Sequence, residues 1–470
     1  MTGARQPETT RGMIGQNFPK ALQPFYRTRK PNSDVLLHRG RLQLEEPGGG
    51  VAEGDGFLRL CWLPVPRIAF SLQPSRINNK MRFLTDPTLR LRLLDRGVSA
   101  SAVSSGPTDH GGAMELEGSL RGPLEPIEPC VCARVIFHVE GFWDMQGSPI
   151  RWSTKRSGMS GRVALRGGDW NITLDPVREL DGPNGLASAL RGSRGYAITH
   201  VGAIEKQDAA VFDRGAAEQI LRDIGCYLSF ARGAWCMPVL PVGLDAQGKR
   251  CWEDWKLKRI DPYVSTMTWC GEDTGDALGA AFPGFLSRRA SSLWRMPVEL
   301  AINWYVESCS ANVTVDTAMV IEQTALELLA WVLKVEDEKS ASASDFEKKY
   351  PAWRRLTLLL QWAGIPSDIP AQMPELAAWC QKAVTPSGKP VSCDGPHAFT
   401  MMRNQVAHAK TGKSLLATAT KARRQAKMLG LWYLGLILLR LFDHNGRYLN
   451  ALVDHPHGGK IEQVPWANQT

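Results

Sequence analysis

The chain of 470 residues is too long for one compact core, so we expect two domains. Apolar residues make up 43% and charged residues 22% of the sequence, which excludes a largely disordered protein. The formal net charge is +9, and Lys and Arg outnumber Asp and Glu two to one in the first hundred residues. This charge fits binding to nucleic acid, although many proteins that bind none are also basic.

The start of the chain gives no sign of export. Residues 1–20 lack the apolar segment of a signal peptide, and the ten cysteines are too sparse for a secreted scaffold held by disulfides. We therefore expect a cytoplasmic protein. Residues 1–34 as a whole are interpreted as an N-terminal extension ahead of the first domain.

Residues 35–275 have the sequence pattern of a β-rich domain, because Gly and Pro interrupt them every ten to twenty positions. Within this region, residues 98–123 are dominated by Ser, Gly and other small residues, which predicts a mobile surface insertion. One helix is expected from Arg214 to Phe230. The segments richest in strand-forming residues are Arg134 to Trp143, Trp170 to Leu174 and Tyr196 to Ile204.

Helical periodicity follows a bridge at residues 276–291 and continues through residues 292–452, ahead of a tail at residues 453–470. Within this region, a stripe of mostly apolar residues spaced three and four positions apart predicts one helix of five to six turns. Together the two regions predict an α+β protein, in which a β-rich N-terminal domain precedes a C-terminal α-helical bundle. The stripe of that long helix is Val315, Ala318, Glu322, Ala325, Leu328 or Leu329, Val332 and Val335.

The longest apolar run extends from Met428 to Phe442 and is interrupted by Arg440. It falls short of the roughly 20 residues that span a bilayer. We expect a buried helix here, and no association with a membrane.

One predicted helix, between the capping residue Asp394 and a glycine exit at Gly412, carries the residues that point to chemistry. At about 100° per residue, Asn404 and His408 project together from the polar side of this helix. Arg403 lies at the edge of that polar sector, and its long side chain can swing toward an anion held near His408. The apolar sector consists of Phe399, Met402, Val406 and Ala409.

Arg403, Asn404 and His408 provide the groups that cleavage of RNA without a metal needs. RNA carries its own nucleophile, the 2'-hydroxyl, and an imidazole with a pKa of about 6.5 can accept or donate a proton near neutral pH. Arg403 would stabilise the charge on the phosphoryl oxygens, and Asn404 would orient His408 or a phosphate oxygen. The products would carry 2',3'-cyclic phosphate ends, and no metal or other cofactor is required.

An Arg, a polar residue and a His four to six positions after the Arg, on a late helix of a small bundle, resemble the motif of HEPN ribonucleases. The resemblance covers roughly residues 292–452. It implies an endoribonuclease that acts on RNA as a homodimer, formed through the helical domain. Arg403, Asn404 and His408 of both protomers would then line one composite cleft.

The order of the two domains also resembles the ApeA-type abortive-infection proteins of bacterial anti-phage defence. The segments Thr199 to Gly202 and Leu228 to Ala231, with Gly233, add to this resemblance. It implies a toxin or effector whose β-rich domain senses or restrains, responding to a phage-derived or RNA trigger. The alternative is a non-catalytic HEPN-like module for dimerisation or binding, with a β-rich domain that binds a ligand or protein, because a surface Arg and His are more often solvated than catalytic.

Basic residues near the motif are the candidates for substrate binding. His397 falls on the same helical sector as Asn404, although a solvent-exposed first-turn histidine is the commoner outcome. Four basic residues open the following helix and would flank the cleft if the two helices pack antiparallel, where they would contact the RNA backbone. A merely solvated basic face is an equal alternative for these four residues, which are Lys421, Arg423, Arg424 and Lys427.

The cysteine pattern gives only a weak sign of a metal site. Cys130 and Cys132 form a C-x-C pair, with His138 six residues further on. On a strand such a pair points both side chains the same way and lacks a second ligand pair, so no metal site is predicted. The sequence contains neither a G-x-x-x-x-G-K-[ST] loop nor a G-x-S-x-G elbow, which argues against a P-loop NTPase and an α/β-hydrolase.

Overall fold

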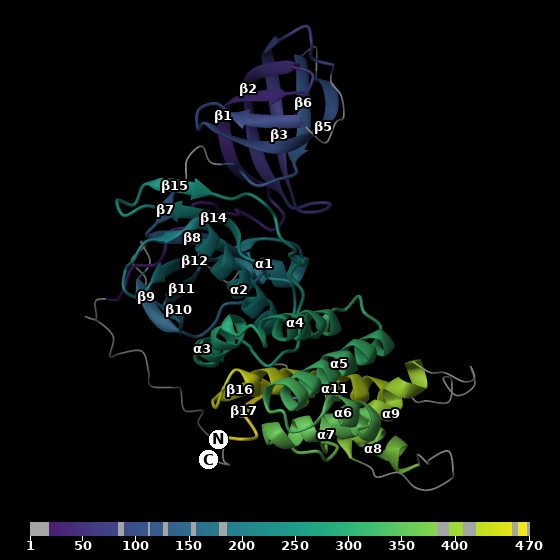
Figure 1. The fold of residues 1–470 in the computed structure, drawn as a ribbon. Helices are drawn as coiled ribbons and strands as arrows, with labels where there is room; N and C mark the ends of the chain where they lie inside the picture. The colour runs from purple at the N-terminus through teal and green to yellow at the C-terminus, as the bar shows by residue number, and fades with distance from the viewer. Residues whose placement is uncertain are drawn as a thin grey trace, which may run out of the picture.

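The computed structural model confirms the α+β class, with β-rich parts before a helical part (Figure 1). A small barrel lies at one end, an open sheet lies in the middle and the helices lie at the other end. The structure describes residues 18–82, 89–110, 113–125, 130–151, 157–177, 186–382, 394–407, 420–453 and 459–467.

The first β-rich unit is a closed barrel with the strand order β1-β2-β3-β6-β5-β4. In β4, three leucines are buried and the arginines between them face solvent, as the two-residue period of a strand requires. Because the sheet closes on itself, each of its strands has a neighbour on both sides. The strands are β1 (Val35–Glu45), β2 (Val51–Cys61), β3 (Arg67–Ile77), β4 (Leu89–Leu93), β5 (Val98–His110) and β6 (Ala113–Leu120).

The prediction of a surface insertion at residues 98–123 was wrong, because most of these residues form β5 and β6 of the barrel. Their small side chains serve the barrel interior. Ala100 and Ala102 are fully buried, and a Cβ atom added at Gly118 would lie 2.5 Å from the ring of Phe70. Small residues in this strand pair therefore make room for large ones opposite.

The second β-rich unit is a seven-stranded sheet with the order β15-β14-β8-β12-β11-β10-β9, in which all neighbouring strands are antiparallel. The three predicted strand segments correspond to β8, β11 and β12. The strands are β8 (Arg134–Glu140), β9 (Ser148–Arg151), β10 (Ser157–Gly167), β11 (Trp170–Pro176), β12 (Ile198–Lys206), β14 (Val239–Leu244) and β15 (Arg250–Glu253), and a two-stranded sheet of β7 (Val131–Cys132) and β13 (Phe212–Asp213) lies beside them.

The predicted helix at residues 214–230 is α2 (Arg214–Arg232). Its N-terminus is capped by Asp213, whose carboxylate accepts a hydrogen bond of 2.7 Å from the amide of Ala216. Its C-terminus is closed by Gly233, whose φ of 65° lies in the left-handed region that favours glycine. A shorter helix, α1 (Leu186–Ser193), precedes β12.

The helical part begins earlier than predicted, because the expected bridge forms α3 (Gly275–Ala290). The expected tail also belongs to the folded C-terminal part, since it contains β17 and the buried Trp466. The further elements are α4 (Arg295–Cys309), α5 (Val315–Trp331), a π-helical turn (Val332–Asp337), α6 (Ala343–Lys349), α7 (Ala352–Ala363), α8 (Pro374–Gln381), α9 (Gly395–Ala407), α11 (Thr420–Leu441), β16 (Arg447–Asn450) and β17 (Lys460–Gln463).

The central sheet and the helices share one continuous core. The ring of Phe230 on α2 lies 5.0 Å from that of Tyr305 on α4 and 5.8 Å from that of Phe442 after α11. The barrel has a separate core, to which residues such as Trp255 contribute from the central part. The physical division therefore lies nearer the barrel than residues 276–291. Among the described helices, none combines the length and apolarity needed to cross a membrane.

Candidate functional site

Helix α9 carries the described part of the predicted motif. The helix starts where the sequence predicts, because the carboxylate of Asp394 accepts a hydrogen bond of 2.8 Å from the amide of His397. Phe399 and Met402 are fully buried and Asn404 is exposed, which confirms the predicted faces for these residues. His408, Ala409 and the predicted exit at Gly412 lie outside the described residues.

The guanidinium of Arg403 is held by Glu327 of α5, at 3.2 Å between Nη2 and Oε1. Its Nη1 donates a hydrogen bond of 2.9 Å to the side-chain oxygen of Asn404. Glu327 also pairs with Arg355 of α7 at 2.8 Å and accepts a hydrogen bond from Gln323 at 2.9 Å. The side chain of Arg403 is 18% exposed, so this arginine is oriented by a network and does not swing freely in solvent.

His397 is not the solvent-exposed histidine that is the commoner outcome for a first-turn position. Its side chain is 14% exposed, and its Nδ1 lies 2.8 Å from Asp394. Its ring stacks on Trp353 of α7 with the centroids 3.8 Å apart. Asn404 lies two helical turns, about 10 Å, further along α9. His397 therefore fixes the start of the helix rather than reaching the motif.

The basic residues of α11 divide into paired and exposed ones. Arg423 forms an ion pair with Asp316 of α5, with 3.0 Å between Nε and Oδ1. The ammonium group of Lys421 lies 3.9 Å from Glu375. Arg424 is exposed and forms no ion pair within the part of the chain that the structure describes. The predicted RNA-binding set therefore loses Arg423 and keeps Arg424, the half-buried Lys427 and Lys421, whose side chain is 80% exposed.

Glu322 was placed in an apolar stripe by the sequence analysis, but it was not recognised as a candidate functional residue. Its side chain is fully buried, and neither carboxylate oxygen has a hydrogen-bond partner in the part of the chain that the structure describes. Burial raises the pKa of Glu322 well above its usual range, and the charge of Lys427 opposes this shift. An acidic residue at a core position of a helical stripe is the signal that could have found it.

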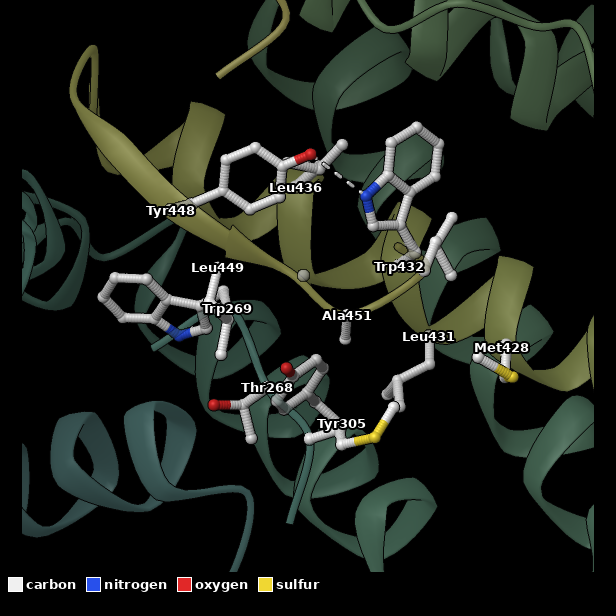
Figure 2. A pocket seen from close by; sticks show the side chains of 13 residues that line it. Thr268, Trp269, Tyr305, Met428, Leu431, Trp432, Leu436, Tyr448, Leu449 and Ala451 are labelled. Carbon is white, nitrogen blue, oxygen red and sulfur yellow. Dashed lines mark hydrogen bonds between the residues drawn. The ribbon is translucent and has the colours of Figure 1, made fainter. Parts of the chain in front are cut away.

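A small apolar pocket lies between α4, α11, the strand β16 and the segment before α3 (Figure 2). Its volume is about 60 Å³. Trp432 closes part of its wall and donates a hydrogen bond of 3.3 Å to the hydroxyl of Tyr448. The pocket fits a small apolar group. Other lining residues include Met267, Trp269, Tyr305, Met428 and Leu452.

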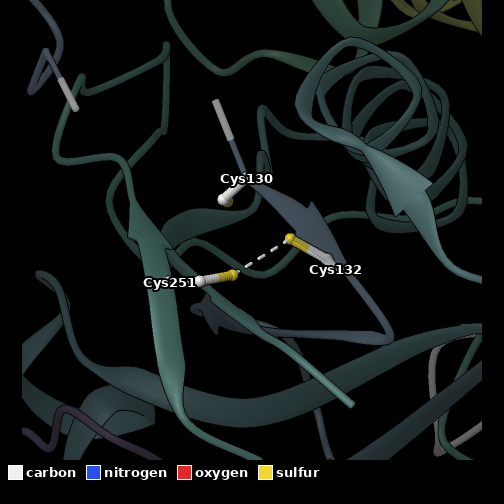
Figure 3. A group of neighbouring side chains, drawn as sticks. All are labelled: Cys130, Cys132 and Cys251. Carbon is white, nitrogen blue, oxygen red and sulfur yellow. Dashed lines mark hydrogen bonds between the residues drawn. The ribbon is translucent and has the colours of Figure 1, made fainter. Parts of the chain in front are cut away.

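Three cysteines meet at the edge of the central sheet (Figure 3). The sulfur atoms of Cys130, Cys132 and Cys251 all lie within 4.8 Å of one another. The C-x-C spacing gives no sign of Cys251, which lies far away along the chain. His138 takes no part, because its Nε2 accepts hydrogen bonds of 3.1 Å from the amides of Phe25 and Tyr26.

Comparison with known proteins identifies two similar domain families. Residues 128–266 match the YopA central domain, and residues 291–462 match the YopA C-terminal domain. Over 450 residues the chain is 27% identical to the SPbeta prophage-derived uncharacterized protein YopA of Bacillus subtilis (strain 168). The aligned residues cover 95% of this chain and 98% of that protein. No solved structure matches the chain.

Proposed function

We propose that this protein is a metal-independent endoribonuclease of the HEPN type, which acts in the cytoplasm as a toxin or effector of anti-phage abortive-infection defence. One observation carries the proposal. Arg403 lies at the edge of the polar sector of α9 and donates a hydrogen bond to the exposed Asn404, and His408 follows four positions after Asn404 in the sequence. Arg403 is also oriented by Glu327, so its guanidinium needs little ordering when a phosphate binds.

In the proposed reaction, His408 accepts the proton of the 2'-hydroxyl while that oxygen attacks the phosphorus atom. The bond from phosphorus to the 5'-oxygen breaks, and this oxygen receives a proton as it leaves. The products are a 2',3'-cyclic phosphate and a 5'-hydroxyl. Arg403 stabilises the phosphoryl oxygens, and its hydrogen bond to Asn404 fixes one side of its planar fork.

The proposed reaction needs a base and an acid, whereas one chain supplies one motif histidine. A homodimer through the helical domain would bring the histidine of a second protomer to the same cleft. The β-rich domain would then respond to a phage-derived or RNA trigger. Arg424 of α11 would contact the RNA backbone, because it is exposed and lacks an ion pair among the described residues.

The second candidate function is a non-catalytic module for dimerisation or binding. The observation that favours it is that two arginines of the candidate site are paired within the bundle. Arg403 is bound to Glu327, and Arg423 is bound to Asp316. In this alternative both pairs stabilise the bundle, and the protein turns over no RNA under any condition.

The deciding experiment uses purified full-length protein with single-stranded and structured RNA in EDTA. We expect cleavage with 2',3'-cyclic phosphate ends, and a loss of rate of about 10²- to 10⁴-fold in Arg403→Ala and in His408→Ala. Arg354→Ala, an exposed arginine of the adjacent helix α7, is the matched control and should cleave normally. Thermal unfolding must show that each variant is folded.

Cells challenged with phage extend this test to conditions in which the trigger is present. Intact protein should protect the culture, and His408→Ala should not. Retention of cleavage by either motif variant would exclude the proposed site. Absence of cleavage by the intact protein, both purified and during infection, would support the non-catalytic alternative.

A further inference from the structure

The three cysteines at the edge of the central sheet form a group that the proposed ribonuclease does not use. We propose that Cys130, Cys132 and Cys251 bind one zinc ion through three thiolates. Their sulfur atoms lie within 4.8 Å of one another, which is close enough for one ion to contact all three. The zinc site lies in the central sheet, so its presence does not depend on the motif on α9.

The distance between the sulfur atoms fits zinc better than a disulfide. Cys132 and Cys251 have their sulfurs 3.8 Å apart and pointing toward each other (Figure 3). Two thiolates bound to zinc at about 2.3 Å with a tetrahedral angle lie about 3.8 Å apart. The two sulfurs of a disulfide lie about 2.05 Å apart. Small rotations of the side chains would bring Cys130 to the same separation.

The backbone holds the two contributing segments together without help from the thiols. Cys132 lies in β7, where it pairs with Phe212 of β13, and the amide of Ala133 donates a hydrogen bond of 2.8 Å to the carbonyl of Leu244. Cys251 lies in β15, the edge strand that pairs with β14. The ligands are therefore positioned before any ion binds, which lowers the entropic cost of binding.

Gly243 of β14 creates the space that Cys132 occupies. A Cβ atom at this position would lie 2.5 Å from the sulfur of Cys132, which is closer than real Cβ contacts. Cys132 itself is fully buried, whereas Cys130 and Cys251 are half-buried. The cluster thus has one sulfur fixed in the core and two nearer the surface, where an ion from solvent can reach them.

Zinc binding would release the protons of the three thiols, because the thiolate is the form that binds the metal.

The fourth coordination position would be open to water or to an added ligand. Within the described residues, no further Cys, His, Asp or Glu joins the group. Cys251 also lines a pocket of about 230 Å³, whose wall includes Arg96, Val98 and Leu124 from the barrel side. The ion would therefore fasten the segment that leaves the barrel to the edge strand of the central sheet.

The test measures zinc bound to the full-length protein. The protein is purified anaerobically with reductant, stripped with a chelator, incubated with ZnCl₂ and analysed for metal by mass spectrometry after gel filtration. We expect one zinc per chain, and its loss in Cys251→Ser and in Cys132→Ser. Cobalt in place of zinc should give thiolate-to-metal absorption bands in the wild type and not in Cys132→Ser or Cys251→Ser.

Cys61→Ser is the matched control, because Cys61 is a half-buried thiol of the barrel whose pKa is raised to about 11. This variant should keep the zinc. Cys251 lies on an edge strand, so Cys251→Ser preserves the test if Cys132→Ser fails to fold. The proposal is overturned if the reduced wild type binds no zinc, if Cys251→Ser binds as much, or if Cys132 and Cys251 form a disulfide under anaerobic purification.

Discussion

Around α9 the polar side chains are paired with one another, whereas at the edge of the central sheet three thiols lie close together. Arg403, Glu327 and Arg355 form a network of ion pairs across three helices. Cys132 and Cys251 approach each other at 3.8 Å and carry raised pKa values. The charged groups around α9 thus pair with one another, whereas the edge of the central sheet offers thiols that fit an added ion.

A linear motif and a spatial cluster therefore give different kinds of support for a function. The motif on α9 is readable because its residues lie on one helix, yet the same residues also serve as structural ion pairs. The thiol cluster has almost no linear signal, yet its geometry matches a known type of metal site. Stability and binding measurements on variants show how strongly the groups of each region interact with their neighbours.

The largest expected effect concerns His138, the histidine that the sequence placed near the C-x-C pair. It is fully buried, and burial lowers its pKa to about 4. Because the pKa is lower in the folded state, its contribution to stability is complete above about pH 6.5 and is lost as the pH falls through about 4. Between pH 7 and pH 4 the free energy of unfolding should fall by about 3 kcal/mol from this group.

Urea unfolding of the wild type and His138→Gln over this pH range measures that step, which the variant should lack. Glutamine can replace both hydrogen-bonding roles of the ring, so it is the mildest change. The same variant should keep its zinc, since His138 is bound to Phe25 and Tyr26 and not to the thiols. Loss of zinc in His138→Gln would place the histidine in the metal site and contradict the comparison.

The next effect tests the network on α9. Glu327→Ala leaves Arg403 and Arg355 without their carboxylate, which should lower the free energy of unfolding by about 2 kcal/mol. This is less than for a fully buried pair, because the Glu327 side chain is 24% exposed. Asp345→Ala, which removes an exposed pair with Lys349, should cost less than about 1 kcal/mol. Equal denaturant midpoints for the two variants would show that the network contributes no stability.

A smaller effect is expected at Glu322, the fully buried carboxylate of α5. Its pKa is raised in the folded state, so its stabilising contribution is present at low pH and is lost as the pH rises through that raised pKa. Glu322→Gln should remove this loss and be more stable than the wild type at high pH, by on the order of 1 kcal/mol. A variant that is less stable than the wild type at pH 8 would show that the charge of Lys427 outweighs burial.

The smallest effect compares two neighbouring arginines of α11. Arg424→Ala should weaken RNA binding by about threefold and reduce the slope of log affinity against log salt by about 1, because one phosphate contact is lost. Arg423→Ala should leave RNA binding nearly unchanged, since its guanidinium is bound to Asp316. Fluorescence anisotropy at several salt concentrations measures both. A larger loss in Arg423→Ala would show that its ion pair opens for RNA.

The sequence by itself determined the elements that local periodicity encodes. The division into β-rich and helical parts, helix α2 and the two faces of α9 follow from spacings within a few residues. Phe399 and Met402 are three positions apart and are buried on the same side of α9, as helical geometry requires. Such patterns are visible because a regular element exposes and buries its residues at a fixed period.

The tertiary structure alone decided which distant residues meet. Arg403 and Glu327 are 76 positions apart, and Cys132 and Cys251 are 119 positions apart. The small residues of β5 and β6 suggested a loop until the barrel placed Gly118 against Phe70. No period in the sequence records such contacts, because they arise when separate elements pack, and packing depends on side-chain volume and charge across the whole core.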